Sequence, residues 1–432
     1  MKFQRVEVRN LRSLIILMLL LVAAGAGNAQ QSQTSSPETT DPAKLDSLRR
    51  SGIEALYNLD FDKAERDFKE IVRLYPSHPA GPQLLAARVW TKTLYESRRL
   101  QSSLYSSESF YSSGEDKVDA KIIGEFRNLT REAKRLADAR LKQNPKDIEA
   151  LYWLGAEEGL KASFEEAVER RHFAALRDGN DSVDHHRDVL KLDPNFVDVG
   201  ITIGLYEYAV GSLPLPIKVL AGITGFRGSK KKGLAMIERT AKEGNWARDD
   251  ARTLLIVLYT REKRYADALA NARELTAKYP RNYLFRLEAA DALVSLAEVE
   301  RKNKNIEGAV KAEREAFATF EDLLHDRSVR DTVTRALDLV HFKYGEVLLT
   351  AGEGERAAKE FLAATKVERA EPTLVTMAHL YAARAFDLAG KRDEALSHYR
   401  QVLTRPDIYA AHDEAKKGLR QPYKTEIASS GI

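Results

Sequence analysis

Pairs of short amphipathic helices recur along this chain, and this repetition constrains the fold more than any other feature of the sequence. The clearest pair lies in residues 250–280, DARTLLIVLYTREKRYADALANARELTAKYP. Its first half places apolar residues at helical spacing on one face, at Ala251, Leu254, Leu255, Leu258 and Tyr259. Its second half does the same at Tyr265, Ala268, Leu269, Ala272 and Leu275. Pro280 then ends the second helix, because proline disfavours helical geometry in the residue before it. The segment therefore predicts a helical hairpin.

This hairpin resembles a tetratricopeptide repeat (TPR). The residues at the positions that define the family are Leu255, Tyr259, Tyr265, Ala268, Ala272 and Pro280. Ile256 stands where the family has a glycine. In such repeats small residues let neighbouring helices approach closely, and large residues fill the gaps between them.

The same offsets recur over most of residues 45–415. The matching residues are Gly52, Phe61, Ala64, Phe68, Ile71 and Pro76, then Ala133, Ala137, Pro145, Leu154 and Gly155, then Pro194 and Gly204, then Tyr344, Gly345, Ala357, Phe361 and Ala364, and finally Gly390, Ala395, Tyr399 and Val402. Several matches at consistent spacing are far stronger evidence than one match. The resemblance implies an all-α fold, a superhelical array of helical hairpins (a TPR-like α-solenoid).

This array is predicted to span residues 44–419. A helix near its end, from His412 to Leu419, would cover the last apolar face, as a solenoid requires. Residues 420–432 have no apolar periodicity and are predicted to be a disordered tail. Residues 101–116 are rich in serine and are predicted to form a surface loop.

The first 29 residues have the pattern of a secretory signal peptide. Four basic residues precede or flank an unbroken apolar run of 11 residues, Leu14 to Ala24, and small residues at Gly27 and Ala29 favour cleavage before Gln30. The run is short for a membrane-spanning helix, although a retained anchor is the alternative. Residues 30–43 are almost free of apolar side chains and are predicted to be a flexible tether. The chain is therefore expected in the periplasm or associated with the outer envelope of a bacterium.

Composition excludes several classes of function. The chain has no cysteine, which excludes disulfides, thiolate metal sites and a cysteine nucleophile. Its formal net charge is +4, but residues 1–29 hold four basic residues and one acid, so the chain without them is near neutral. A near-neutral net charge gives no indication that the chain binds nucleic acid.

Residues 211–233, GSLPLPIKVLAGITGFRGSKKKG, are unlike the rest of the chain. We interpret them as an insertion or remodelled corner of the array, in which Pro214 ends one helix, Ile217–Ile223 form a short buried helix, and Gly225 and Gly228 form a turn with positive φ. Lys230–Lys232 are then expected to begin the next helix, unpaired and facing solvent. The alternative is peripheral membrane contact through this apolar and basic segment.

The surrounding residues 204–238 resemble one family more specifically, the tetratricopeptide repeat protein 39 or inclusion-body-clearance family. The shared residues are Ser212, Leu213 and Pro214, then Gly225, Phe226 and Gly228, and then Gly233 and Leu234. The resemblance implies the structural corner. A signal peptide departs from that family's usual setting, so no cellular role follows.

No motif for catalysis, a cofactor or a metal stands out. The His185–His186 pair is the only histidine cluster, but adjacent helical residues point about 100° apart, so a solvated helix face is favoured over a metal site. The paired acids Glu157–Glu158 and Glu165–Glu166 are interpreted as helix surface in a chain with 31% charged residues. Residues 222–233 lack the order of glycine, lysine and serine or threonine that a phosphate-binding loop requires.

The geometry of the repeat family implies a concave groove lined by the first helix of each hairpin. The residues predicted to line it are Tyr152, Tyr208, Arg261, Phe342 and Arg384. Aromatic residues and arginine are enriched at binding surfaces, although about half of these could instead pack against neighbouring helices. The predicted function is that of a non-catalytic scaffold or adaptor that binds a protein or peptide partner, without a cofactor.

Overall fold

The chain is almost entirely helical where its structure is described. The computed structural model describes residues 41–98, 100, 118–214 and 227–424, and contains no strand within these ranges. The described residues fall into two compact units, one up to Glu262 and one from Lys263 onward. No helix in the described part of the chain is both long and apolar enough to cross a bilayer.

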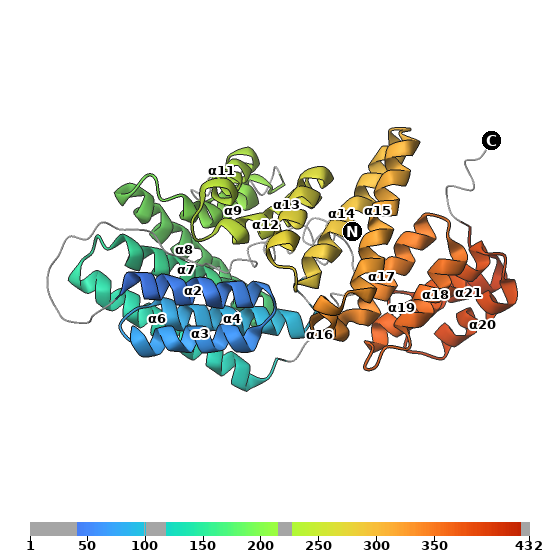
Figure 1. The fold of residues 1–432 in the computed structure, drawn as a ribbon, viewed down its shortest axis with the longest axis horizontal. Helices are drawn as coiled ribbons and strands as arrows, with labels where there is room; N and C mark the ends of the chain where they lie inside the picture. Colours follow the sequence, from blue (N-terminus) through green and yellow to red (C-terminus); the bar gives the residue numbers. More distant parts are fainter. Residues whose placement is uncertain (1–40, 99, 101–117, 215–226, 425–432) are drawn as a thin grey trace. The chain divides into compact units, whose positions relative to one another are not determined.

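Unit 1 is a succession of antiparallel helices, coloured blue to yellow-green in Figure 1. Its elements are α2 (Pro42–Tyr57), α3 (Phe61–Leu74), α4 (Ala80–Glu96), α6 (Ala120–Gln143), α7 (Ile148–Phe164), the π-helix η2 (Glu165–Glu169), α8 (His172–Leu192), the 3-10 turn η3 (Val197–Val199), α9 (Gly200–Gly211), α11 (Lys230–Glu243) and α12 (Arg248–Arg261). Each α-helix packs against the next, and α4 also packs against α7.

Unit 2, coloured yellow to red in Figure 1, repeats this arrangement. Its elements are α13 (Tyr265–Lys278), α14 (Tyr283–Lys302), α15 (Ile306–His325), the short turns η4 (Arg327–Val329), α16 (Arg330–Val333) and η5 (Thr334–Ala336), then α17 (Leu337–Thr350), α18 (Gly354–Ala364), α19 (Pro372–Leu388), α20 (Arg392–Leu403) and α21 (Ala411–Arg420). Neighbouring long helices pack in pairs, and α17 also contacts α19, which in turn contacts α21. The predicted array of helical hairpins is confirmed.

One backbone device recurs at the turns of the hairpins. A residue with positive φ lies two positions before α3, α13, α15, α18 and α20. These residues are Leu59, Lys263, Lys304, Gly352 and Gly390, with φ between 60° and 83°. A left-handed residue after a helix turns the chain sharply and lets the next N–H bond back to the helix end. The hairpins therefore share a turn geometry that residue type alone does not reveal, since three of the five are not glycine.

Prolines set the other ends of the hairpins, as predicted. Helices α3, α6, α8 and α13 each end two residues before a proline. These prolines are Pro76, Pro145, Pro194 and Pro280. The residue between helix and proline has a ψ of 62° to 97°, outside the helical range, which is the restriction that a following proline imposes.

Glycines face aromatic rings inside the hairpins. A Cβ at Gly52 would lie 2.3 Å from the ring of Phe68, and a Cβ at Gly345 would lie 2.8 Å from the ring of Phe361. In the α7–α8 hairpin the ring over Gly155 belongs to His186, whose Cδ2 would lie 2.4 Å from such a Cβ. His186 therefore takes the place of an aromatic packing residue and is buried. The expectation that it lies on a solvated face is wrong.

The predicted corner at residues 211–233 is described at its two ends only. Helix α9 ends at Gly211, three residues before Pro214, so the predicted helix end is confirmed to within a turn. Residues 215–226, which include the predicted short helix and Gly225, lie outside the described residues. Gly228 does not have the expected positive φ. A glycine is needed there because a Cβ would lie 2.6 Å from the carbonyl oxygen of Glu207.

The lysines that follow are not all unpaired, contrary to expectation. Ser229 caps α11 by accepting a hydrogen bond from the N–H of Lys232. The Nζ of Lys230 lies 2.5 Å from a carboxylate oxygen of Glu262, and the Nζ of Lys232 lies 3.1 Å from one of Glu207. The approach of α9 and α12 to the start of α11 supplies these two acids, which the local sequence could not indicate.

The chain ends differ slightly from the predicted boundaries. The predicted signal peptide and most of the predicted tether lie outside the described residues, and α2 already begins at Pro42, capped by the side chain of Asp41. The helix predicted from residue 412 is present as α21 and packs against α19 and α20. Beyond it, the N–H of Tyr423 donates to a carboxylate oxygen of Asp387 at 2.8 Å, so the first residues of the predicted tail pack against unit 2.

Candidate functional site

Several acidic side chains that were predicted to lie on helix surfaces are buried inside unit 1. Glu157 and Glu158 on α7 and Glu165 and Glu166 on η2 are each at most 6% exposed. Helix α7 packs against α4, α6 and α8, so it has no solvent face along most of its length. A signal for this burial is present in the sequence, because the segment from Ala150 to Ala167 has apolar residues on all sides, the pattern of an enclosed helix.

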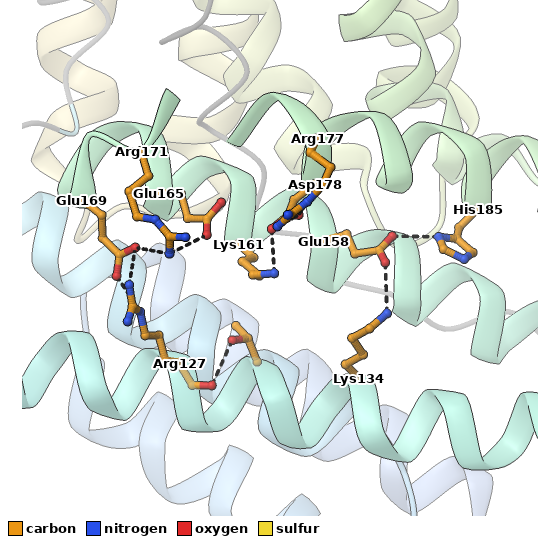
Figure 2. Close-up of polar contacts among 11 residues, drawn as sticks. Arg127, Lys134, Glu158, Lys161, Glu165, Glu169, Arg171, Arg177, Asp178 and His185 are labelled. Atoms are coloured by element: carbon orange, nitrogen blue, oxygen red, sulfur yellow. Dashed lines mark hydrogen bonds and ion pairs between the residues drawn. The ribbon is translucent and has the colours of Figure 1, made fainter. Parts of the chain in front are cut away.

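Cations pair with several acids of this part of unit 1, as Figure 2 shows. From α6, Lys134 lies 3.2 Å from Glu158 and Arg127 lies 2.7 Å from Glu169. On the other side of Glu158, the Nδ1 of His185 on α8 lies 2.7 Å away. We call the charged residues of α6, α7, η2 and α8 in Figure 2 the ionic cluster.

The second half of the ionic cluster joins α7 and η2 to the start of α8. The Nζ of Lys161 lies 2.6 Å from Oδ2 of Asp178, whose Oδ1 is 2.9 Å from Nη2 of Arg177. Arg171 lies 3.2 Å from Glu165 and 3.5 Å from Glu169. A buried network of this kind fixes how helices sit against one another, because each partner left unpaired would be costly.

Burial and neighbouring charges move the pKa values of Asp178, in the ionic cluster, and of Glu157, beside it, in opposite directions. Burial, with smaller contributions from Glu158 and Asp178, raises the pKa of Glu157 to about 8. Burial also opposes ionisation of Asp178, but hydrogen bonds from Lys161 and Arg177 outweigh it and lower the pKa of Asp178. Glu157 is therefore a neutral carboxylic acid at pH 7, and its Oε2 has no hydrogen-bond partner among the described residues.

We expect Glu157→Gln to change how stability depends on pH. The unfolded chain releases the proton of Glu157 near 4.5 and the folded chain only near 8, so rising pH between these values favours unfolding. Glutamine cannot ionise and removes this cost. From pH 5 to pH 8 the variant should gain about 3 kcal/mol of unfolding free energy relative to the parent chain. Urea denaturation at a series of pH values measures the difference.

Glu125→Gln is the matched control, because Glu125 lies exposed on α6. Its difference from the parent chain should stay constant across the same pH range. Parallel pH profiles for Glu157→Gln and the parent chain would show that Glu157 ionises normally in the folded chain, and would contradict the burial argument.

The structure places the three aromatic residues of the predicted groove inside the core. Tyr152 is 1% exposed, with its ring 5.3 Å from His186 and 4.8 Å from Trp246. Tyr208 and Phe342 are fully buried. The hydroxyl of Tyr208 donates to Glu262 at 2.5 Å. These rings match the packing alternative of the sequence analysis.

The two arginines of the predicted groove are partly exposed and lie in different units. Arg261 is half-buried at the end of α12. Arg384 on α19 pairs with Glu414 at 2.8 Å, and its guanidinium lies over the rings of Tyr381 and Tyr423, 5.0 and 5.4 Å from their centroids. A role of these arginines in binding a partner stays a prediction.

The described residues contain no group of three or more histidine, cysteine, aspartate or glutamate side chains arranged to hold a metal ion. His185 and His186 have different surroundings: His185 contacts an acid, and His186 is buried. His185 pairs with Glu158, which raises the pKa of His185, whereas burial lowers the pKa of His186 to about 4.

Residues 377–407 match the family model of the tetratricopeptide repeat. The matched segment covers most of α19 and all of α20, with the left-handed Gly390 at the turn and Ala395 and Tyr399 buried. The chain therefore carries a tetratricopeptide repeat. No curated protein matches the chain, so the resemblance of residues 204–238 to one particular repeat family stays an expectation.

Several solved tetratricopeptide-type and other helical structures are similar to this chain at low sequence identity. A human IFIT1 dimer with m7Gppp-AAAA has 15% identity and a TM-score of 0.40, over 88% of this chain and 85% of that one. Yeast Tom70 has 13% identity and a TM-score of 0.31, over 88% and 96%. A tetratricopeptide repeat protein from Parabacteroides merdae has 15% identity and a TM-score of 0.30, over 78% and 99%.

Proposed function

We propose that this chain is a non-catalytic scaffold that binds a protein or peptide partner in the envelope of a bacterium. The observation that carries the proposal is the succession of helical hairpins in both units, one of which matches the tetratricopeptide repeat. Such arrays present extended surfaces built from many helices, and these surfaces bind other proteins.

The proposed location rests on the sequence of residues 1–29, with its basic start, short apolar run and small residues before Gln30. Cleavage there would release a near-neutral chain with a polar N-terminal segment. Intact-mass measurement of the protein from fractionated cells tests this part of the proposal. A cytoplasmic protein that keeps Met1 would contradict it.

Chemical cross-linking in the native cells tests the scaffold function. The expected result is a reproducible set of cross-linked proteins, of which those bound by unit 2 disappear when the α19–α21 region is unfolded by Gly418→Leu. In this variant the leucine would clash with the ring of Tyr399, which lies 2.2 Å from a Cβ placed at Gly418. A protein that gives no specific cross-links at any position would contradict the proposal.

The rival function is membrane association through residues 211–233. A vesicle-sedimentation experiment distinguishes it from the scaffold function. The described ends of this segment favour a structural corner, since Lys230 and Lys232 each pair with an acid of the same unit. The purified chain should therefore stay in the supernatant when vesicles of phosphatidylglycerol and phosphatidylethanolamine are sedimented. Sedimentation that is lost in Lys231→Gln, at an exposed lysine of this segment, would favour the membrane.

A further inference from the structure

One large apolar side chain of unit 1 is almost fully exposed to solvent. Phe173, in the first turn of α8, is 91% exposed, whereas the next most exposed large apolar side chain of the described residues, Ile306, is 56% exposed. Leu176, three residues later, is 50% exposed. Residues three apart on a helix lie on one face, so Phe173 and Leu176 form a small apolar patch. A phenylalanine held in water loses the free energy that its burial would supply.

The charged groups beside this patch are layered, with cations outside and carboxylates inside. The side chains of Arg171, His172 and Arg177 are 50%, 51% and 65% exposed. The carboxylates that they pair with, on Glu165, Glu166, Glu169 and Asp178, are 3% to 6% exposed. An approaching molecule therefore meets the cationic layer first, although the cluster as a whole is largely neutralised.

The backbone before α8 places one more cation at this surface. The π-helix η2 ends at Glu169, and Arg170 after it has a left-handed backbone with φ of 56° and an exposed side chain. The N–H of Arg171 donates to the carbonyl of Glu165 at 2.8 Å and closes this turn. π-Helical turns are rare and frequently occur at functional sites. Here the turn separates the buried acids of η2 from the exposed start of α8.

We propose that Phe173 and Leu176, with Arg170, Arg171 and Arg177 around them, form a docking surface for an acidic segment of a partner protein. Phe173 would enter an apolar pocket of the partner, and carboxylates at the rim of that pocket would pair with the exposed arginines. Buried aromatic anchors supply much of the binding energy at interfaces, whereas charges at the rim steer association and set its dependence on salt. The inference rests on the proposed scaffold function and names the partner's chemistry.

An anionic membrane fits this surface less well. Binding to a bilayer surface requires a long apolar face with basic residues along it. After the patch, α8 continues with acids that face solvent, and the side chains of Asp184 and Asp188 are 72% and 46% exposed. Arg187 and Lys191 pair with these acids, so this stretch of α8 offers anionic lipids no net positive charge, whereas a short protein segment would contact only the first turns of α8.

A photo-cross-linker at the patch tests the inference in the native cells. Benzoylphenylalanine replaces Phe173 in one strain and the exposed Lys242 of α11 in a control strain. We expect position 173 to cross-link to a protein segment in which acids outnumber bases and flank apolar residues. Equal cross-linking from both positions would overturn the inference. So would capture of a neutral or basic protein segment, of lipid alone, or of a segment of this chain itself.

The cross-linked segment is then made as a fluorescent peptide, and its affinity for the purified chain and its variants is measured. Phe173→Ser should weaken its binding to the purified chain at least about tenfold, and Leu192→Ser, at an exposed leucine on the same helix, should leave it unchanged. Arg170→Gln should weaken binding a few-fold and reduce its dependence on salt. Unchanged affinity in Phe173→Ser would overturn the inference. If other positions capture partners and position 173 does not, the scaffold function stands and only this surface fails.

Discussion

Gly233→Val is expected to lower the unfolding free energy of unit 1 by more than about 3 kcal/mol or to prevent its folding. Helices α9 and α11 cross where Gly204 meets Gly233, and a Cβ at Gly233 would lie 2.3 Å from the carbonyl oxygen of Gly204 and 2.5 Å from the backbone nitrogen of Tyr208. Both obstacles are backbone atoms, so no change of rotamer relieves the overlap. Thermal unfolding followed by circular dichroism measures the effect.

Gly124→Ala is the matched control for this prediction. Gly124 lies in the interior of α6, and a Cβ there would meet nothing within 4 Å. Because alanine favours a helix interior over glycine, this variant should be more stable by about 0.5–1 kcal/mol. A Gly233→Val protein as stable as the parent chain would show that α9 and α11 do not cross at these glycines.

Lys161→Met is expected to cost unit 1 about 2–4 kcal/mol at neutral pH. The ammonium of Lys161 lies 2.6 Å from the buried carboxylate of Asp178, and its charge also favours the ionised forms of Glu157 and Glu165. Methionine keeps the volume of the side chain but leaves Asp178 with Arg177 as its only cation in the described part of the chain. The expected cost is below that of a fully enclosed pair, because about a third of the lysine side chain is hydrated.

Two further variants separate charge from shape at this position. Lys161→Arg keeps the charge and should lose less stability than Lys161→Met. Asp178→Asn combined with Lys161→Met should cost less than the two single changes added together, because the pair is removed as a unit. Additive losses in urea denaturation would mean that Lys161 and Asp178 do not interact, and would contradict the ionic cluster as described.

The helices themselves could be predicted from the sequence, because they depend on short-range physics. Apolar spacing and the prolines are local signals, and each acts within a turn or two of its own position. Pro76, Pro145, Pro194 and Pro280 mark helix ends to within two residues. Glycines such as Gly52 and Gly345 likewise indicate close packing wherever a large ring follows at the repeat spacing. The fold class follows from these signals alone.

The candidate site could not be predicted in this way, because its chemistry is supplied by other helices. The apolar residues around Glu157 and Glu165 indicate an enclosed segment, but which side chains lie against these acids depends on α4, α6 and α8 packing around α7. Tyr152 and Tyr208 lie in largely apolar segments, which indicate an enclosed helix but do not show which elements cover the two rings. Lys161 on α7 and Arg177 on α8 then lower the pKa of the buried Asp178.

The sequence by itself therefore determined that this chain forms hairpins of amphipathic helices, because the free energy of a helix and of its ends depends on residues a few positions apart. The tertiary structure decided which helices are enclosed, which charges are paired and which side chains remain in water. Burial and ion pairing depend on distances between residues far apart in the chain. The inward Glu157 and the outward Phe173 lie 16 positions apart in one hairpin, and only the packing of α7 and α8 distinguishes their environments.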